Sequence, residues 1–200
     1  MTYDLLVPAH TVFGPGRFEE VGGLGRALGT TAFVISGSRQ LAANGTLKRL
    51  DTLLGDAGVE TVHVGSIHHE PCVDDVDGMT LSVRSRLTDD SFIIGIGGGA
   101  ALDLAKAVSA TTTNEHLESV KDALEGVGKG LQLEQAPLPL LALPTTAGTG
   151  SECTKNAVIS SNPDDAAPFK KSLRSNLMVP NAVLIDPELA VSVPADVTAR

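Results

Sequence analysis

Three consecutive glycines give the strongest chemical signal in the sequence. The segment Gly97–Gly99 follows the apolar run Ser91–Ile96 and precedes the helix-like segment Ala100–Ala110. Glycine can take positive φ and has no Cβ, so bare backbone can approach a ligand closely. The free N–H groups and the positive dipole end of the following helix point back at the turn, which favours a diphosphate. We therefore predict that Gly95–Lys106 wraps the pyrophosphate of a dinucleotide.

The spacing of these glycines differs from the common GxGxxG pattern. A tight strand-to-helix connection without a ligand therefore stays open as an alternative. Asp103 lies one turn into the helix, where a carboxylate can complement the helix dipole or fix the loop.

A second loop is rich in hydroxyl groups. Pro144–Glu152 (PTTAGTGSE) follows the apolar run Pro137–Leu143 and holds four hydroxyl side chains and two glycines after its proline. Such a loop can offer hydroxyl and amide donors to phosphate and ribose oxygens. Taken alone, the loop slightly favours another interpretation, in which it forms hydrogen bonds with the free backbone groups at the end of a strand.

These loops lie within an alternation of strand-like and helix-like segments. We expect buried strands at Thr31–Ser36, Glu60–Val64, Ser91–Ile96 and Pro137–Leu143. Helices are predicted at Thr46–Ala57, Val73–Leu87 and Ala100–Ala110, with a polar helical stretch near Glu115–Glu125 and short strand candidates at Ala157–Ser160 and Ala182–Asp186. The pattern predicts the α/β class, with a doubly wound parallel sheet and one domain over residues 1–200.

Charge and composition restrict the partners. The net charge is -9, with 24 acidic and 15 basic residues, so the surface repels nucleic acid and acidic membranes. Cys72 and Cys153 form no CxxC pair and are expected to be reduced thiols. The N-terminus does not resemble a signal peptide, and the longest apolar stretch is too short to span a bilayer. These features predict a soluble cytoplasmic protein.

Three segments together resemble the iron-containing (group III) alcohol dehydrogenase family in order and spacing: GGGAALDLAKA, PTTAGTGSE, and Lys170 with PNAVLIDPEL. The resemblance runs from about His10 to Arg200. It implies the Rossmann-like N-terminal domain of a dehydroquinate-synthase-like fold, followed by a helical domain. The cofactor would lie in the cleft between the two domains, with the metal on the helical side.

The resemblance also implies roles for individual residues. The pyrophosphate would be held by Gly97, Gly98, Gly99 and Ala100, although the family commonly has serine at the position of Ala100. Asp103 would lie beside the nicotinamide end or order the glycine turn. The phosphate and adenosine side would be lined by Thr145, Thr146 and Thr149. Lys170 would reach the nicotinamide ribose, with Lys171 as the alternative; either lysine can also be a solvated surface charge.

The cofactor is expected to be NADP or NAD, with NADP(H) favoured. The family often has aspartate after the second strand, where it binds the adenosine ribose, and this chain has Gly37 between two serines, followed by Arg39. An acid would repel a 2′-phosphate, whereas this sequence can accept one.

The metal ligands of the family, an Asp-x-x-x-His pair and two later histidines, are expected outside this chain. None of its histidines matches a ligand position: His10, His63, His68, His69 and His116. Asp196 comes too early to be the family's aspartate. We therefore assign no metal ligand here, although the intact enzyme would use iron or zinc.

The resulting hypothesis is the cofactor-binding part of a metal-dependent, NAD(P)-dependent dehydrogenase of small alcohols or aldehydes, inactive by itself. Alternatives are a relative similar to maleylacetate reductase or glycerol dehydrogenase, and a truncated, non-catalytic nucleotide-binding module. A homodimer is expected, and an apolar face that normally meets the helical domain would favour self-association if left uncovered.

Overall fold

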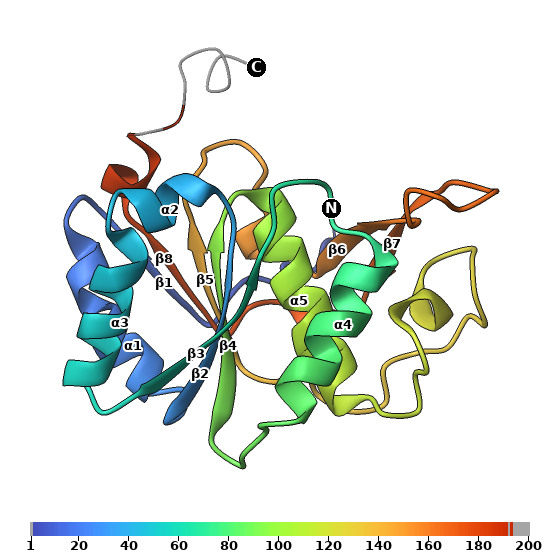
Figure 1. Ribbon diagram of the computed structural model, residues 1–200, viewed down its shortest axis with the longest axis horizontal. Coiled ribbons are helices and arrows are strands. Elements are labelled where there is room, and N and C mark those ends of the chain that lie inside the picture. The colour runs from blue at the N-terminus through green and yellow to red at the C-terminus, as the bar shows by residue number, and fades with distance from the viewer. Residues whose placement is uncertain (1, 192, 194–200) are drawn as a thin grey trace.

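The computed structural model describes residues 2–191 and 193, and a six-stranded parallel sheet lies at its centre (Figure 1). The strand order is β1-β8-β5-β4-β2-β3. The strands are β1 (His10–Phe13), β2 (Thr31–Ser36), β3 (Glu60–Ser66), β4 (Ser91–Gly97), β5 (Leu140–Pro144) and β8 (Ala182–Ile185). The prediction of an α/β fold with a parallel sheet is confirmed.

Helices cover both faces of the sheet. On one face lie α1 (Val21–Arg26) and α3 (Thr46–Asp56), and on the other α4 (Val73–Arg84) and α5 (Gly99–Thr113) (Figure 1). The short α2 (Arg39–Ala43) follows β2 directly. Short 3-10 helices lie at Arg17–Glu20, Val120–Ala123, Ser151–Cys153, Asn176–Met178 and Pro187–Ala190. Among the residues that the structure describes, no helix is long and apolar enough to cross a bilayer.

Alternate residues of one strand enter two different cores. In β2, Phe33 packs with Leu104 and Val76 on the α4–α5 side, whereas Val34 packs with Leu50 on the α1–α3 side. A strand buried on both faces needs apolar residues at every position, not at every second one. This requirement explains why the central strands are continuous aliphatic runs.

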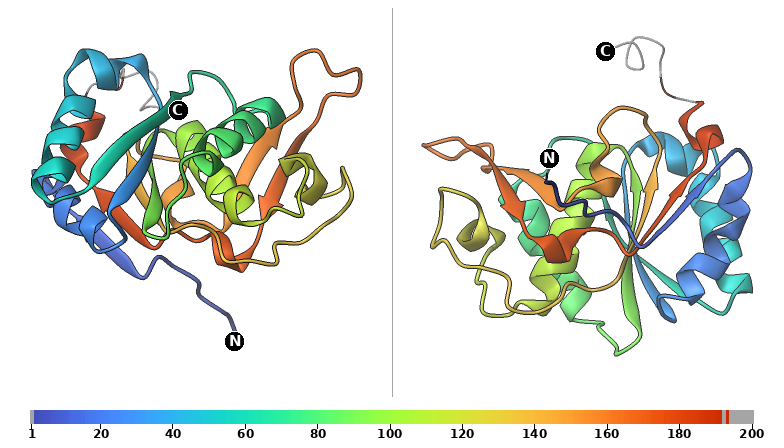
Figure 2. Two further views of the ribbon diagram at one scale, coloured as in Figure 1. Left: turned by 60° about the horizontal axis from the view of Figure 1, so that its bottom comes forward. Right: turned by 180° about the vertical axis from the view of Figure 1, so that it is seen from behind.

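A two-stranded antiparallel hairpin extends the fold beside α5. It consists of β6 (Asn156–Ser160) and β7 (Lys170–Arg174), and Ala157, Ile159 and Leu173 join the core on the α4–α5 side. In both views of Figure 2 the hairpin lies on the side of the molecule opposite α1 and α3.

The structure corrects one predicted helix and the start of one predicted strand. The polar helical stretch predicted near Glu115–Glu125 is wrong, because only the 3-10 helix Val120–Ala123 forms there. The side chain of Asn114 ties the chain to Gln135 at the end of α5, and Asp77 accepts the Val120 N–H, so local helix is replaced by tertiary contacts. The strand predicted from Pro137 begins at Leu140, because prolines lack the N–H that a central strand must donate.

The order of the strands opens a crevice at one edge of the sheet. From β2 the chain continues to β3 on one side, and then returns to β4 on the other side of β2. The carboxyl ends of β2 and β4 therefore mark a topological switch point, where open α/β sheets bind their ligands.

Candidate functional site

The glycine turn lies at this switch point and leaves no room for side chains. Gly97 ends β4 with φ 153°, and a Cβ there would stand 2.8 Å from the Cβ of Ala101 and 3.0 Å from the Cα of Gly37. Gly98 caps α5 and Gly99 begins it. Because the first N–H groups of a helix have no partner within it, they are available at the surface of the turn.

Gly37 brings the end of β2 against the end of β4. Its N–H donates to the carbonyl of Ile96 at 2.8 Å, and a Cβ on Gly37 would lie 3.2 Å from the Cα of Gly97. Gly37 and Gly97 are 60 residues apart in the sequence. The first was predicted to lie near the adenosine ribose and the second near the pyrophosphate, and the structure brings them into contact.

The second loop packs against the opposite side of the same turn. The N–H of Thr145 donates to the carbonyl of Gly97 at 2.9 Å. A Cβ on Gly98 would lie 3.3 Å from Oγ1 of Thr146, and one on Gly99 would lie 2.9 Å from Cγ2 of Thr149. Thr145 is only 5% exposed and packs beneath the surface of the turn, whereas Thr146 is partly exposed and Thr149 is exposed. The two loops therefore form one unit.

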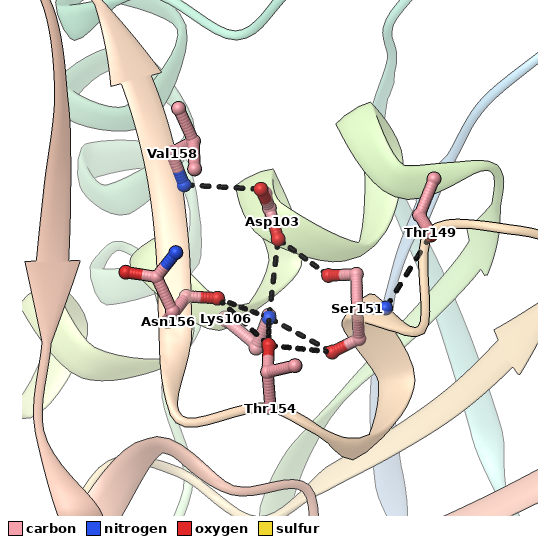
Figure 3. Close-up of polar contacts among 7 residues, drawn as sticks. All are labelled: Asp103, Lys106, Thr149, Ser151, Thr154, Asn156 and Val158. Carbon is pink, nitrogen blue, oxygen red and sulfur yellow. Dashed lines mark hydrogen bonds and ion pairs between the residues drawn. The ribbon is translucent and has the colours of Figure 1, made fainter.

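Asp103 fixes the second loop and the hairpin to α5 (Figure 3). One carboxylate oxygen accepts the hydroxyl of Ser151, and the other accepts the N–H of Val158 at 3.0 Å. These contacts order the PTTAGTGSE loop. Asp103 also lines a cavity together with Gly99 and Ala100, and its place beside the nicotinamide end stays a prediction.

Lys106 is a buried cation beside Asp103, and sequence analysis gave it no role of its own. Its side chain is 1% exposed, and Nζ lies 3.1 Å from the Asp103 carboxylate. The ammonium donates to the carbonyl of Ser151 and the hydroxyl of Thr154, both at 2.9 Å, and to the carbonyl of Asn156 (Figure 3). Burial lowers the pKa of Lys106, and the charge of Asp103 opposes that shift. In the sequence, the i,i+3 spacing of Asp103 and Lys106 is the pattern that could have indicated this ion pair.

Three adjoining cavities run along the carboxyl edge of the sheet. The β2-end cavity, of about 360 Å³, is lined by residues that include Gly37, Arg39, Ala42, Leu47 and His68. The turn cavity, of about 410 Å³, is lined by Gly37, Ser38, His68, Gly98 and Ala100, among others. The hairpin cavity, of about 440 Å³, lies against Ala100, Asp103, Thr149, Asn156 and Lys170.

Shared residues set the order of these cavities. The β2-end and turn cavities share Gly37, Ser38 and His68, and the turn and hairpin cavities share Ala100 and Glu70. The glycine turn is therefore in the middle of a continuous groove, with a separate cavity at each end. An elongated ligand with a central anionic group fits this order.

The hairpin cavity has a polar wall. Lys170 stands at its rim, with Nζ 2.6 Å from the carboxylate of Glu70, and both side chains are more than half exposed. Lys171 does not line this cavity, and its Nζ lies near Gly126 instead. Asn156 lines it and has a buried Oδ1 that no hydrogen-bond donor of the described residues reaches. A ligand with a donor group would satisfy that oxygen.

The described residues do not fit a metal centre. Among them, no group of three or more His, Cys, Asp or Glu side chains comes together. His63 pairs with Asp51 at 2.9 Å, and His116 lies 3.0 Å from the carbonyl of Gln132. Asp196 falls outside the described residues. We therefore derive no chemical step through a metal from these side chains.

Comparison with known proteins places these features in one family. The family model for iron-containing alcohol dehydrogenase matches residues 8–187. Choline dehydrogenase from Bacillus subtilis (strain 168) is 33% identical over 194 residues, which are 96% of this chain and 46% of that protein.

Solved structures agree with this result. NADH-dependent butanol dehydrogenase A from Thermotoga maritima superposes with a TM-score of 0.86 at 26% identity, covering 98% of this chain and 47% of that one. Sulfoacetaldehyde reductase from Bifidobacterium kashiwanohense, solved in complex with NAD+, gives 0.80 at 29% identity, with 97% and 48% covered. The chain spans about half the length of the relatives that it matches.

Proposed function

Because the chain belongs to the iron-containing alcohol dehydrogenase family, we propose that it binds a nicotinamide dinucleotide for hydride transfer between an alcohol and an aldehyde. The observation that supports this most directly is the groove centred on the glycine turn. Gly37, Gly97 and Thr145 meet there through backbone contacts, with a cavity on either side.

The order of the cavities supports one arrangement of the cofactor. The pyrophosphate would lie over Gly98, Gly99 and Ala100, where the helix N–H groups and dipole favour negative charge. Ala42 and Leu47 offer an apolar surface for adenine in the β2-end cavity. The nicotinamide end then enters the hairpin cavity, where Asn156 and Lys170 can bind the carboxamide and the ribose.

The bound nicotinamide would accept or return the hydride of the alcohol carbon. The residues described here contribute binding and orientation. Asp103 and Lys106 hold the hairpin wall in place, and the glycine turn fixes the diphosphate. The relatives reported above are named for choline, butanol and sulfoacetaldehyde, so we propose small alcohols or aldehydes as the substrate class of the whole enzyme.

We propose NADP(H) as the preferred cofactor, although two of the solved relatives are named for NADH or NAD+. Of the described residues that line the β2-end cavity, none is acidic, and Arg39 is among them. A carboxylate at the position of Gly37 would repel a 2′-phosphate, and its absence removes that penalty.

Two further proposals concern the state of the protein. Exposed apolar side chains are frequent near the N-terminus, and β1 is an edge strand, so we propose self-association as a homodimer. The thiols of Cys72 and Cys153 are free, which supports a cytoplasmic location.

Substitutions at Ala100 test cofactor binding without disturbing the fold. Ala100 is half-buried in the first turn of α5 and lines both the turn and hairpin cavities. Aspartate stabilises the first turn of a helix, yet it would oppose a diphosphate at the same place. We expect Ala100→Asp to weaken NADPH binding by roughly tenfold or more, since two like charges about 4 Å apart near a protein surface repel each other by about 1–4 kcal/mol. Ala100→Ser should bind at least as tightly as the unmodified chain.

The measurement is titration of NADPH and NADH by fluorescence or calorimetry, with circular dichroism to show that each variant is folded. A folded, unmodified chain that binds neither dinucleotide at millimolar concentration would contradict the proposed function. Equal binding by the Asp and Ser variants would place the diphosphate elsewhere.

A further inference from the structure

The groove identifies where the adenosine ribose must lie, given the proposed function on which this step rests. The ribose joins the adenine to the diphosphate, so it must occupy the junction of the β2-end and turn cavities. The residues common to both cavities are Gly37, Ser38 and His68. Two of them follow β2 directly, and His68 comes from the segment after β3.

The polar groups around this junction are suited to a phosphate monoester. His68 is exposed, and its Nε2 lies 3.3 Å from the hydroxyl oxygen of Ser66, which also lines the β2-end cavity. Arg39 is the neighbouring cation, and its guanidinium can pair with two phosphate oxygens. The Ser38 hydroxyl oxygen accepts the N–H of Gln40 at 3.1 Å and can still donate its own hydrogen.

The contacts of the neighbouring titratable groups make His68 the best candidate among them for binding a phosphate monoester at the junction. His63 also lines the β2-end cavity, but its Nε2 already contacts the carboxylate of Asp51 at 2.9 Å. Glu70 lines the turn cavity and is paired with Lys170 at 2.6 Å. Of the three cavities, His69 lines only the turn cavity, and its Nδ1 lies 2.9 Å from the carbonyl of Glu70.

We propose that His68, together with Arg39, binds the 2′-phosphate of NADP and is a specificity-determining residue of this chain. His68 lies at the junction, in the segment after β3. Arg39 lines the β2-end cavity beside it, at the start of α2. Discrimination between NADP and NAD then depends on a pair of donors, in addition to the missing acid at Gly37. Neither donor is needed for the part of the cofactor that the two dinucleotides share.

The test compares ligands that differ only by the 2′-phosphate. The unmodified chain, His68→Gln, Arg39→Gln and the double variant are titrated with NADPH and NADH, and with 2′,5′-ADP and 5′-AMP as fragments. His116→Gln and Arg26→Gln are the matched controls, because these exposed residues line none of the three cavities.

We expect His68→Gln and Arg39→Gln each to weaken NADPH and 2′,5′-ADP binding by roughly tenfold, the effect of losing a hydrogen bond to a charged group. Binding of NADH and 5′-AMP should change less than about twofold by the same reasoning. An unchanged NADPH affinity in His68→Gln, or equal losses for both members of each pair, would overturn the assignment while leaving dinucleotide binding intact. If neither dinucleotide binds to the unmodified chain, the proposed function itself fails.

Discussion

Gly97 shows how one backbone conformation can determine a site. Its φ of 153° is a conformation that residues with a side chain rarely adopt, and the space where a Cβ would stand is occupied by Ala101 and Gly37. Glycine is therefore required here by both conformation and packing. The carbonyl of the same residue accepts the N–H of Thr145, so a shift at this position would move the second loop as well.

At the scale of the residue, we predict opposite effects for two glycine-to-alanine changes. Gly97→Ala should destabilise the protein by about 2–4 kcal/mol, from backbone strain and overpacking. The control is Gly78→Ala in the middle of α4, where an added Cβ meets nothing within 4 Å. It should stabilise by about 0.5–1 kcal/mol. Urea unfolding measures both values; a Gly97→Ala protein as stable as the unmodified chain would refute the packing argument.

The helix α5 connects all parts of the site. Its N-terminus begins in the glycine turn, and Asp103 and Lys106 in the next turns hold the second loop and β6. The buried ammonium donates to two carbonyl oxygens and a hydroxyl, and the same hydroxyl donates to both carbonyls, so the three groups and Lys106 form one buried network. The helix thus positions the hairpin wall relative to the glycine turn.

This arrangement predicts a pH-dependent stability. Lys106→Met should destabilise the fold by on the order of 3 kcal/mol at neutral pH, because buried acceptors and Asp103 lose their cation. Burial lowers the pKa of Lys106 in the folded protein below its ordinary value of 10.5. In the alkaline range below 10.5 the unfolded chain therefore holds more protons, and the stability contributed at Lys106 rises with pH.

The measurement is the difference in unfolding free energy between the unmodified chain and Lys106→Met, taken at several alkaline pH values. We expect that difference to grow as the pH rises. Lys48→Met on the exposed side of α3 serves as the control and should give a constant difference. A difference that falls with pH for Lys106→Met would show that the ammonium is more stable in the fold than in water.

The whole molecule combines a well-buried sheet with an exposed apolar N-terminal segment. Tyr3 is 81% exposed, Leu5 75% and Phe13 65%, and Phe13 lies on the edge strand β1. An open strand edge can pair with another chain. The net charge of -9 opposes non-specific association, so contact between copies should be confined to such apolar surface.

We predict that this segment mediates self-association. Sedimentation velocity should show dimers or larger species at micromolar concentrations, and the double change Leu5→Asp and Phe13→Asp should shift them towards monomer. Leu81→Asp is the matched control, since Leu81 is an equally exposed leucine on α4 (66%). A shift caused equally by the control would mean that general hydrophobicity, not this segment, drives association.

Most of the fold could be predicted where local sequence and tertiary context agree. The predicted strand Thr31–Ser36 coincides with β2 because a strand buried on both faces is a continuous aliphatic run. The strand β7 could not be predicted, since its residues KKSLR contain one apolar side chain and become a strand through pairing with β6.

The candidate site was predictable to a similar degree. The two loops could be selected because the carboxyl ends of parallel strands meet at one edge of the sheet. The burial of Lys106 could not be predicted, because a lysine in a helix normally reads as a surface charge. The contacts that surround it come from residues 45 to 50 positions away.

The contact between Gly37 and Gly97 limits which side chains position 37 can hold. An acid at position 37 would require a Cβ 3.2 Å from the Cα of Gly97 and 3.4 Å from the Cβ of Ala101. Any side chain at position 37 therefore requires the glycine turn or Ala101 to shift by a few tenths of an ångström. Ser38 is exposed, so substitutions there are the better starting point for engineering the proposed cofactor preference.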